Sequence, residues 1–96
     1  MMKHTPGPWF INGHERYTKY VEARIGGGWV QEVAACGPTE NPEQQEANAR
    51  LCAAAPDLLE GLKKALEPLE MYHAYGWPDR DGVIGQIKSA IAKATA

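Results

Sequence analysis

The sequence predicts an α+β fold in which a small antiparallel sheet of two or three strands lies within residues 9–36 and is covered by C-terminal helices. Two observations lead to this prediction. Ahead of the segment GPTENP at 37–42, turn-forming residues separate short alternating stretches; after it, apolar residues recur at helical spacing. The chain has 96 residues, 44% hydrophobic and 23% charged, so we expect one globular domain over residues 1–96. The two or three expected helices cover, to within about two residues, 42–55, 57–72 and 81–94.

The expected strands are bounded by turn signals. Two prolines hold the segment HTPGPW at 4–9 extended, because the residue before a proline is kept out of the α region. A first short strand is expected over 9–11, before the turn dipeptide Asn12-Gly13. The second strand, over 20–25, alternates with period two and therefore has one face with Val21, Ala23 and Ile25 and another with Tyr20, Glu22 and Arg24.

Three glycines, GGG at 26–28, are expected to form the turn into a third strand over 29–36. A phosphate-binding loop is the alternative for such a run, but that loop needs a helix after it, and here a strand follows. The pattern of this third strand is irregular, because regular alternation places Val30 and Val33 on opposite faces.

Caps and prolines mark the helix starts. Asn41 is a favourable N-cap with Pro42 at the first helical position. Pro56 cannot continue a first helix but can open a second, so the alanine-rich stretch EANARLCAAAPDLL at 46–59 is interpreted as a helix corner and not as an active site. Pro68 is expected to kink or shorten the second helix. That helix carries an apolar stripe of five leucines, Leu58, Leu59, Leu62, Leu66 and Leu69.

The charge balance argues against general nucleic-acid binding. The formal net charge is −2 and the pI is about 5.9, so no global positive field attracts phosphates. No apolar run approaches the roughly 20 residues of a membrane span, and the N-terminus lacks the apolar core of a secretory signal. With only Cys36 and Cys52, we expect a cytoplasmic protein, in the host cell, with both thiols reduced.

Three stretches occur in a specific order: HTPGPW at 4–9, EANARLCAAAPDLLEGLKKAL at 46–66 and AIAKAT at 90–95. Together they resemble a recurring class of small proteins encoded by tailed phages and prophages, and the middle stretch is the most specific. Members of that class more often carry Ile in place of Cys52 and Ala in place of Gly61, which are packing changes. The resemblance implies a phage accessory role, usually performed by binding a host or phage component. It carries over no catalytic or binding residue.

Metal and thiol chemistry have weak signals. The histidines and cysteines, which are His4, His14, His73, Cys36 and Cys52, show no pair at the short spacing of zinc ligands. Cys52 lies in an apolar helical stretch, and Cys36 is the more exposed candidate nucleophile at the end of a strand. We therefore predict a protein that is not an enzyme and that uses no metal or other cofactor.

The aromatic residues are the most suggestive group. We expect Trp9, Trp29 and Tyr20 to help fill the core between sheet and helices. Tyr17 and Trp77 fall in turn-rich loops, where exposed aromatics beside Arg are typical interface anchors. The predicted partner-binding residues are accordingly Trp77, Arg80, Tyr17 and Arg16, with Trp77 and Arg80 first.

The leading hypothesis is a non-enzymatic protein that binds a host or phage protein stoichiometrically, such as an inhibitor of a host defence system. The alternative is a module that binds nucleic acid or a small nucleotide through Tyr20, Lys19 and Arg24. A third hypothesis, a thiol- or metal-dependent enzyme, requires a reactive Cys36. The leucine stripe also makes a homodimer an open alternative to a monomer.

Overall fold

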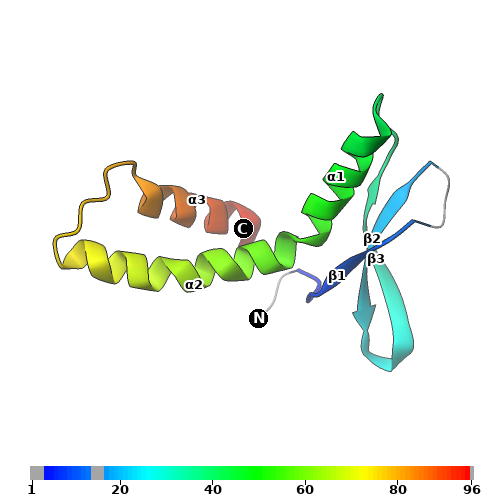
Figure 1. Cartoon of the computed structure of the whole chain (residues 1–96). Coiled ribbons are helices and arrows are strands. Elements are labelled where there is room, and N and C mark those ends of the chain that lie inside the picture. The colour runs from blue at the N-terminus through cyan, green and yellow to red at the C-terminus, as the bar shows by residue number, and fades with distance from the viewer. Residues whose placement is uncertain (1–3, 14–16, 96) are drawn as a thin grey trace. The chain divides into compact units, whose positions relative to one another are not determined.

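The structure is a computed structural model that describes residues 4–13 and 17–95 (Figure 1). It confirms the α+β class, with a three-stranded antiparallel sheet followed by three helices. The elements are β1 (Trp9–Asn12), β2 (Lys19–Ile25), β3 (Trp29–Cys36), α1 (Pro42–Ala53), α2 (Ala55–Ala74) and α3 (Val83–Thr95).

The chain divides into two compact units, Met1–Asp57 and Leu58–Ala96. The first contains the sheet, α1 and the first turn of α2. The second contains the rest of α2 together with α3. The expectation of a single domain over residues 1–96 stays a prediction.

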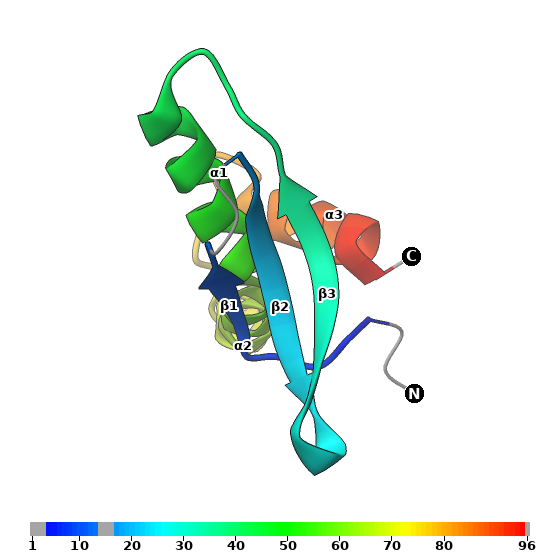
Figure 2. The same cartoon turned by 90° about the vertical axis from the view of Figure 1, so that its right-hand side faces the viewer.

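The sheet has the strand order β1-β2-β3, with both neighbouring pairs antiparallel. Figure 2 shows the three strands side by side with α1 along them. The glycine run forms a short 3-10 turn between β2 and β3, and Gly27 and Gly28 both have a φ of 81°. Because residues other than glycine rarely adopt a positive φ, the glycine run is suited to the hairpin turn predicted for it.

A β-bulge accounts for the irregular pattern of the third strand. On β3, Ala34 pairs with Val21 and Glu32 pairs with Glu22, so Val33 is an extra residue between two consecutive partners on β2. A bulge of this kind shifts the alternation of one strand by one residue. Val30 and Val33 therefore do not follow a single period-two pattern, although β3 is paired along its length.

The core of the first unit lies between β2 and α1. Val21 and Ala23 on β2 and Ala49 on α1 are completely buried, as the predicted inward face of the second strand requires. α1 is the helix that contacts all three strands of this unit. It begins as expected, because the side chain of Asn41 accepts a hydrogen bond of 2.9 Å from the backbone of Glu43.

Two segments that are far apart in sequence meet within the first unit. A Cβ atom built on Gly7 would lie 2.8 Å from the Cβ of Pro56, a distance that leaves no room for a side chain. Gly7 belongs to HTPGPW and Pro56 to the alanine-rich corner between α1 and α2. Two of the stretches that carry the phage resemblance are therefore in direct contact.

The second unit consists of two antiparallel helices. The leucine stripe of α2 lies partly covered beside α3, and an ion pair of 3.2 Å joins Glu70 of α2 to Lys88 of α3. Pro68 lies inside α2, which continues to Ala74, so the expected shortening of the helix at this proline is wrong. Neither α2 nor α3 contains a buried residue.

Candidate functional site

The C-terminal end of α2 is closed by a glycine cap that brings two aromatic rings together. Gly76 has a φ of 97°, and its amide donates to the carbonyl oxygen of His73 at 3.0 Å. The amide of Trp77 donates to the carbonyl oxygen of Tyr72, also at 3.0 Å. This pair of hydrogen bonds is a common helix ending, usually accompanied by an apolar contact between the same two positions. Here that contact is an edge-on ring pair of Tyr72 and Trp77, with centroids 5.3 Å apart.

The N-terminal end of α3 is capped by Asp79. One carboxylate oxygen accepts from the amide of Val83 at 2.8 Å, and the other accepts from the amide of Ile84 at 3.2 Å. A helix start offers unpaired amides and a positive dipole end, which a carboxylate satisfies. Because Asp79 already occupies these amides, this helix start is a structural cap and offers little to an external anion.

Between the two helix ends lies an open cleft of about 430 Å³. Its lining is mixed: Leu69, Trp77 and Val83 are apolar, whereas His73 and Arg80 are polar. The Nδ1 of His73 lies 2.9 Å from the carbonyl oxygen of Trp77, to which it donates in the matching tautomer. The remaining lining residues are Pro78, Asp79, Asp81 and Ile84.

The side chains around the cleft are available to a partner. Trp77 is 59% exposed and Tyr75 is 84% exposed, although both are large aromatic residues. Arg80 is also exposed and forms no ion pair with any residue in the described part of the chain. The cleft, these three side chains and Tyr72 are called the turn surface below.

The structure brings together two of the four residues predicted to bind a partner. Trp77 and Arg80 line the same cleft. Tyr17 belongs to the first unit, where it is exposed and its carbonyl oxygen accepts a hydrogen bond from Gln45. Arg16 lies outside the described residues. The contribution of Tyr17 and Arg16 to partner binding stays a prediction.

The three residues of the alternative nucleotide site do not share one face of the sheet. Tyr20 and Arg24 alternate with the buried Val21 and Ala23, so they lie on the face away from α1. Lys19 is on the same side as Val21, which is the face that α1 covers. Lys19 therefore emerges from β2 on the other side from Tyr20 and Arg24, and nucleotide binding by these three residues stays a prediction.

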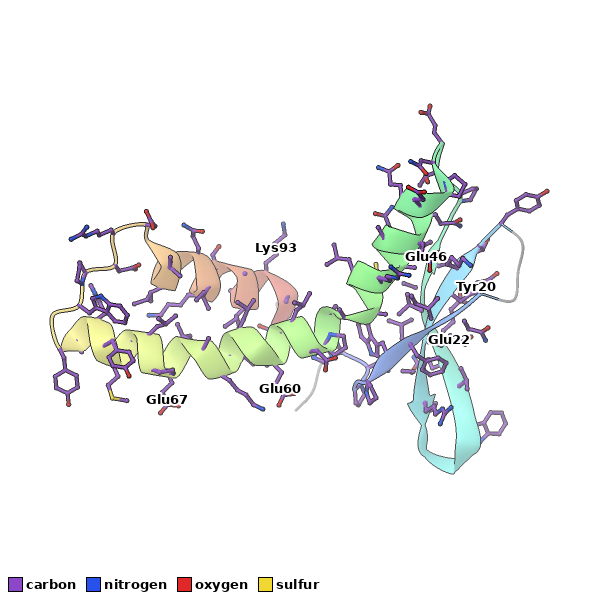
Figure 3. The ribbon with its side chains drawn as sticks, in the orientation of Figure 1. Tyr20, Glu22, Glu46, Glu60, Glu67 and Lys93 are labelled. Carbon is purple, nitrogen blue, oxygen red and sulfur yellow. The ribbon has the colours of Figure 1, made fainter. Side chains whose placement is uncertain are left out.

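The open face of the sheet also carries negative charge. Phe10 pairs with Glu22, and the guanidinium of Arg24 lies 5.6 Å from the centre of the Phe10 ring. Glu22 in turn pairs with Glu32 on β3 and accepts a hydrogen bond of 2.8 Å from the side chain of Asn12. Figure 3 shows Tyr20 and Glu22 on this strand. Two carboxylates beside one arginine make the face unsuited to a phosphate backbone.

The expected aromatic core is only partly present. Trp9 is half-buried, and its indole nitrogen donates to the carbonyl oxygen of Thr5 at 3.1 Å. Trp29 is 71% exposed at the end of the hairpin, so its assignment to the core is wrong. Tyr20 is half-buried but lies on the face away from α1, and so it does not fill the core between sheet and helix. The completely buried residues between β2 and α1 are instead the small side chains of Val21, Ala23 and Ala49.

The two cysteines lie beside each other in the first unit. Burial raises the pKa of the Cys36 thiol, and the neighbouring thiol of Cys52 raises it further. A raised pKa lowers the fraction of thiolate at neutral pH, and the thiolate is the reactive form. Among residues 4–13 and 17–95, no group of three or more His, Cys, Asp and Glu side chains is placed to hold a metal ion.

Sequence reasoning missed the role of Gln45. This residue is buried in α1, and its side-chain amide donates at 2.9 Å to the carbonyl oxygens of both Tyr17 and Cys36. It thereby ties α1 to the ends of β3 and of the segment before β2. The available signal was its place four residues before Ala49, on the same side of the helix as a core alanine.

Within the described chain, no helix combines the length and the apolarity needed to cross a membrane. A family model for Salmonella phage P22 protein Y8K6 matches residues 1–96, which is the full length of the sequence. No curated protein and no solved structure matches the chain. The match supports a small phage protein of unassigned function, as the resemblance implied. By this full-length match the chain belongs to the family of Salmonella phage P22 protein Y8K6.

Proposed function

We propose that this phage protein is not an enzyme and acts by stoichiometric binding of a host or phage protein through the turn surface. The observation that carries the proposal is the exposed Trp77 next to Arg80, which forms no ion pair within residues 4–13 and 17–95, at the edge of a cleft. Trp, Tyr and Arg dominate the few residues that supply most of the binding energy in protein interfaces. The turn surface presents all three residue types within one loop.

The turn surface is also held in place before any partner binds. The glycine cap fixes the backbone of Trp77, and the contact with Tyr72 restricts its ring. The carboxylate of Asp79 fixes the other end of the loop to α3. Ordering a flexible side chain on binding costs roughly 0.5–1.5 kcal/mol, so a loop that is already ordered binds more tightly.

The match to a phage protein family supports the setting that we propose for this binding. In this proposal the chain meets its partner in the cytoplasm of the host cell. Inhibition of a host defence protein by occlusion of its working surface is the specific form of binding that we propose. No cofactor is required for such a mechanism. The raised pKa of Cys36 also favours a binding role over thiol catalysis.

Affinity capture from host lysate, with and without phage infection, tests this proposal. The wild-type chain is compared with a Trp77→Ala/Arg80→Ala variant and with a matched Trp29→Ala/Arg24→Ala variant. The matched variant removes the same two residue types from the exposed surface of the first unit. We expect one specific protein to be captured by the wild type and by the matched variant, and to be lost with the Trp77/Arg80 variant.

Other outcomes contradict parts of the proposal. Equal capture by all three chains would show that the turn surface is not the binding site. Selective loss with the Trp29/Arg24 variant would move the site to the sheet. If nuclease treatment removes the captured material, nucleic acid is the partner, and its capture should also weaken steeply with added salt.

A further inference from the structure

The second unit is small for an independently folded piece of chain. Leu58–Ala96 falls just below the roughly 40 residues under which a fold usually needs a disulfide, a metal or association with another chain. Both free cysteines lie in the first unit, and no metal cluster occurs among the described residues. Two helices alone shield only the sides that face each other, so no residue of α2 or α3 is buried. Further burial of these helices needs another surface, and a second copy of the chain can supply one.

One side of the helix pair is apolar and exposed. On α2, the positions Leu58, Gly61, Pro68 and Tyr72 follow one another at helical spacing, and on α3 the same holds for Val83 and Ala90. Leu58 is 52% exposed, Tyr72 is 55% exposed and Val83 is 41% exposed. These six residues are called the hairpin face below, and two of them, Tyr72 and Val83, also belong to the turn surface.

The ion pair between the helices shows that both parts of the hairpin face lie on one side. Glu70 and Lys88 approach to 3.2 Å and so mark one side of the pair. At about 100° per residue, the α2 stripe lies roughly 170° from Glu70 and the α3 stripe roughly 140–160° from Lys88. Both stripes therefore lie on the side opposite the ion pair.

The charges of the unit lie outside the hairpin face. Helical spacing places Lys63 and Glu67 on the side of the Glu70–Lys88 pair, with Lys64 and Lys93 at the two outer edges. Figure 3 shows Glu60 and Glu67 directed away from α3. In a two-fold interface a face meets an identical copy of itself, so any charge on it would lie near a like charge. An uncharged face avoids this repulsion.

We propose that the hairpin face pairs with the same face of a second copy of this chain, so that two helix pairs form a four-helix assembly. The rise of about 1.5 Å per residue sets the length of each face, and the interaxial distance of about 9 Å sets its width across the two helices. Together they give an area on the order of 500 Å² for each face. Two faces then bury about 1,000 Å², which is near the lower limit of a specific interface. The small residues Gly61 and Ala90 allow the helices to approach closely across it. An interface of this size gives a dimer that depends on concentration.

Substitution of Gly61 separates loss of the dimer from loss of the fold. A Cβ atom at Gly61 meets no heavy atom within 4 Å, so a side chain fits on the free chain. Replacing a helical glycine by Glu favours the helix, but it places a charge in the middle of the proposed interface. Gly61→Ala keeps the face apolar, and Ala92→Glu adds the same charge to α3 on the side of Lys88.

Sedimentation of the full-length chain from low micromolar to low millimolar concentration measures the association. We expect the wild type, Gly61→Ala and Ala92→Glu to rise from the 10.5 kDa monomer towards twice that mass. Gly61→Glu is expected to remain monomeric while its helical circular dichroism signal is equal or stronger. If the wild type stays monomeric at every concentration, the proposal is overturned. The hairpin face would then be covered by something other than a second copy, such as the first unit or another protein. Dimerisation of Gly61→Glu at the wild-type concentration overturns the proposal as well.

Discussion

The two units of the chain differ in where their apolar side chains lie. In the first unit, Val21, Ala23 and Ala49 are completely buried between β2 and α1. In the second unit, the leucines of α2 and the isoleucines of α3 are at most half-buried. A sheet covered by a helix encloses a core, whereas two helices side by side leave most of their surface open. We infer that the first unit holds the fold and that the second unit is the part that binds.

The largest expected effect comes from the core of the first unit. Val21→Ala removes two buried methyl groups and leaves a cavity, so it should lower the free energy of unfolding by about 2–3 kcal/mol. Leu58→Ala removes more atoms, but from a half-exposed position, and should cost within about 0.5 kcal/mol. Urea unfolding at low protein concentration measures both. Equal costs would break the comparison, because the second unit would then be packed as tightly as the first.

The next effect concerns the buried amide that joins α1 to the sheet. Gln45→Ala leaves two carbonyl oxygens without their donors and should cost about 2 kcal/mol. Gln44→Ala is the matched control, since Gln44 is exposed and should change stability by less than about 0.5 kcal/mol. If Gln45→Ala is as mild as its control, water replaces the amide and the link is not important for the first unit.

A smaller effect is expected where the N-terminal segment meets the corner between α1 and α2. Gly7→Ala forces a methyl group against Pro56 and should cost about 1–2 kcal/mol through displacement of one segment. Gly37→Ala is the control, because nothing lies within 4 Å of a Cβ at that position. Thermal unfolding compares the two variants. A Gly7→Ala midpoint equal to that of Gly37→Ala would contradict a tight contact between the two sequence stretches.

The smallest effect concerns the second unit. Asp79→Ala removes the side chain that caps α3 and should destabilise that helix by about 1 kcal/mol. Asp81→Ala should cost less, because the interaction of Asp81 with Gln86 uses its carbonyl oxygen, which the substitution keeps. Hydrogen exchange of the α3 amides reports this local change. Unchanged exchange in Asp79→Ala would show that the cap does not hold the turn surface in place.

Much of the fold could be predicted because local chemistry determines it. Asn41 and Pro42 set the start of α1, the glycine run sets the β2–β3 turn, and alternation in β2 identifies its buried face. The bulge at Val33 could not be located, since it depends on pairing with β2. The exposure of Trp29 was missed for a related reason. Its place at the end of the hairpin, beyond the reach of the core, follows only once the strand lengths are known.

The candidate site was predictable in its residue types but not in its geometry. Turn-forming residues around Trp77 and Arg80 indicated an exposed loop, and the cleft confirms that both lie in one place. The capping role of Asp79 was not foreseen, because the carboxylate reaches the helix from four residues before Val83 instead of from the usual N-cap position.

Hydrogen exchange of the full-length chain at several protein concentrations tests the central claim most directly. Amides of β2 and α1 should be strongly protected at every concentration, because they surround the buried residues of the first unit. Amides of α2 beyond Leu58 and of α3 should exchange faster in dilute solution and become slower as the concentration rises. Equal protection of both units at all concentrations would contradict the division into a unit that folds and a unit that binds.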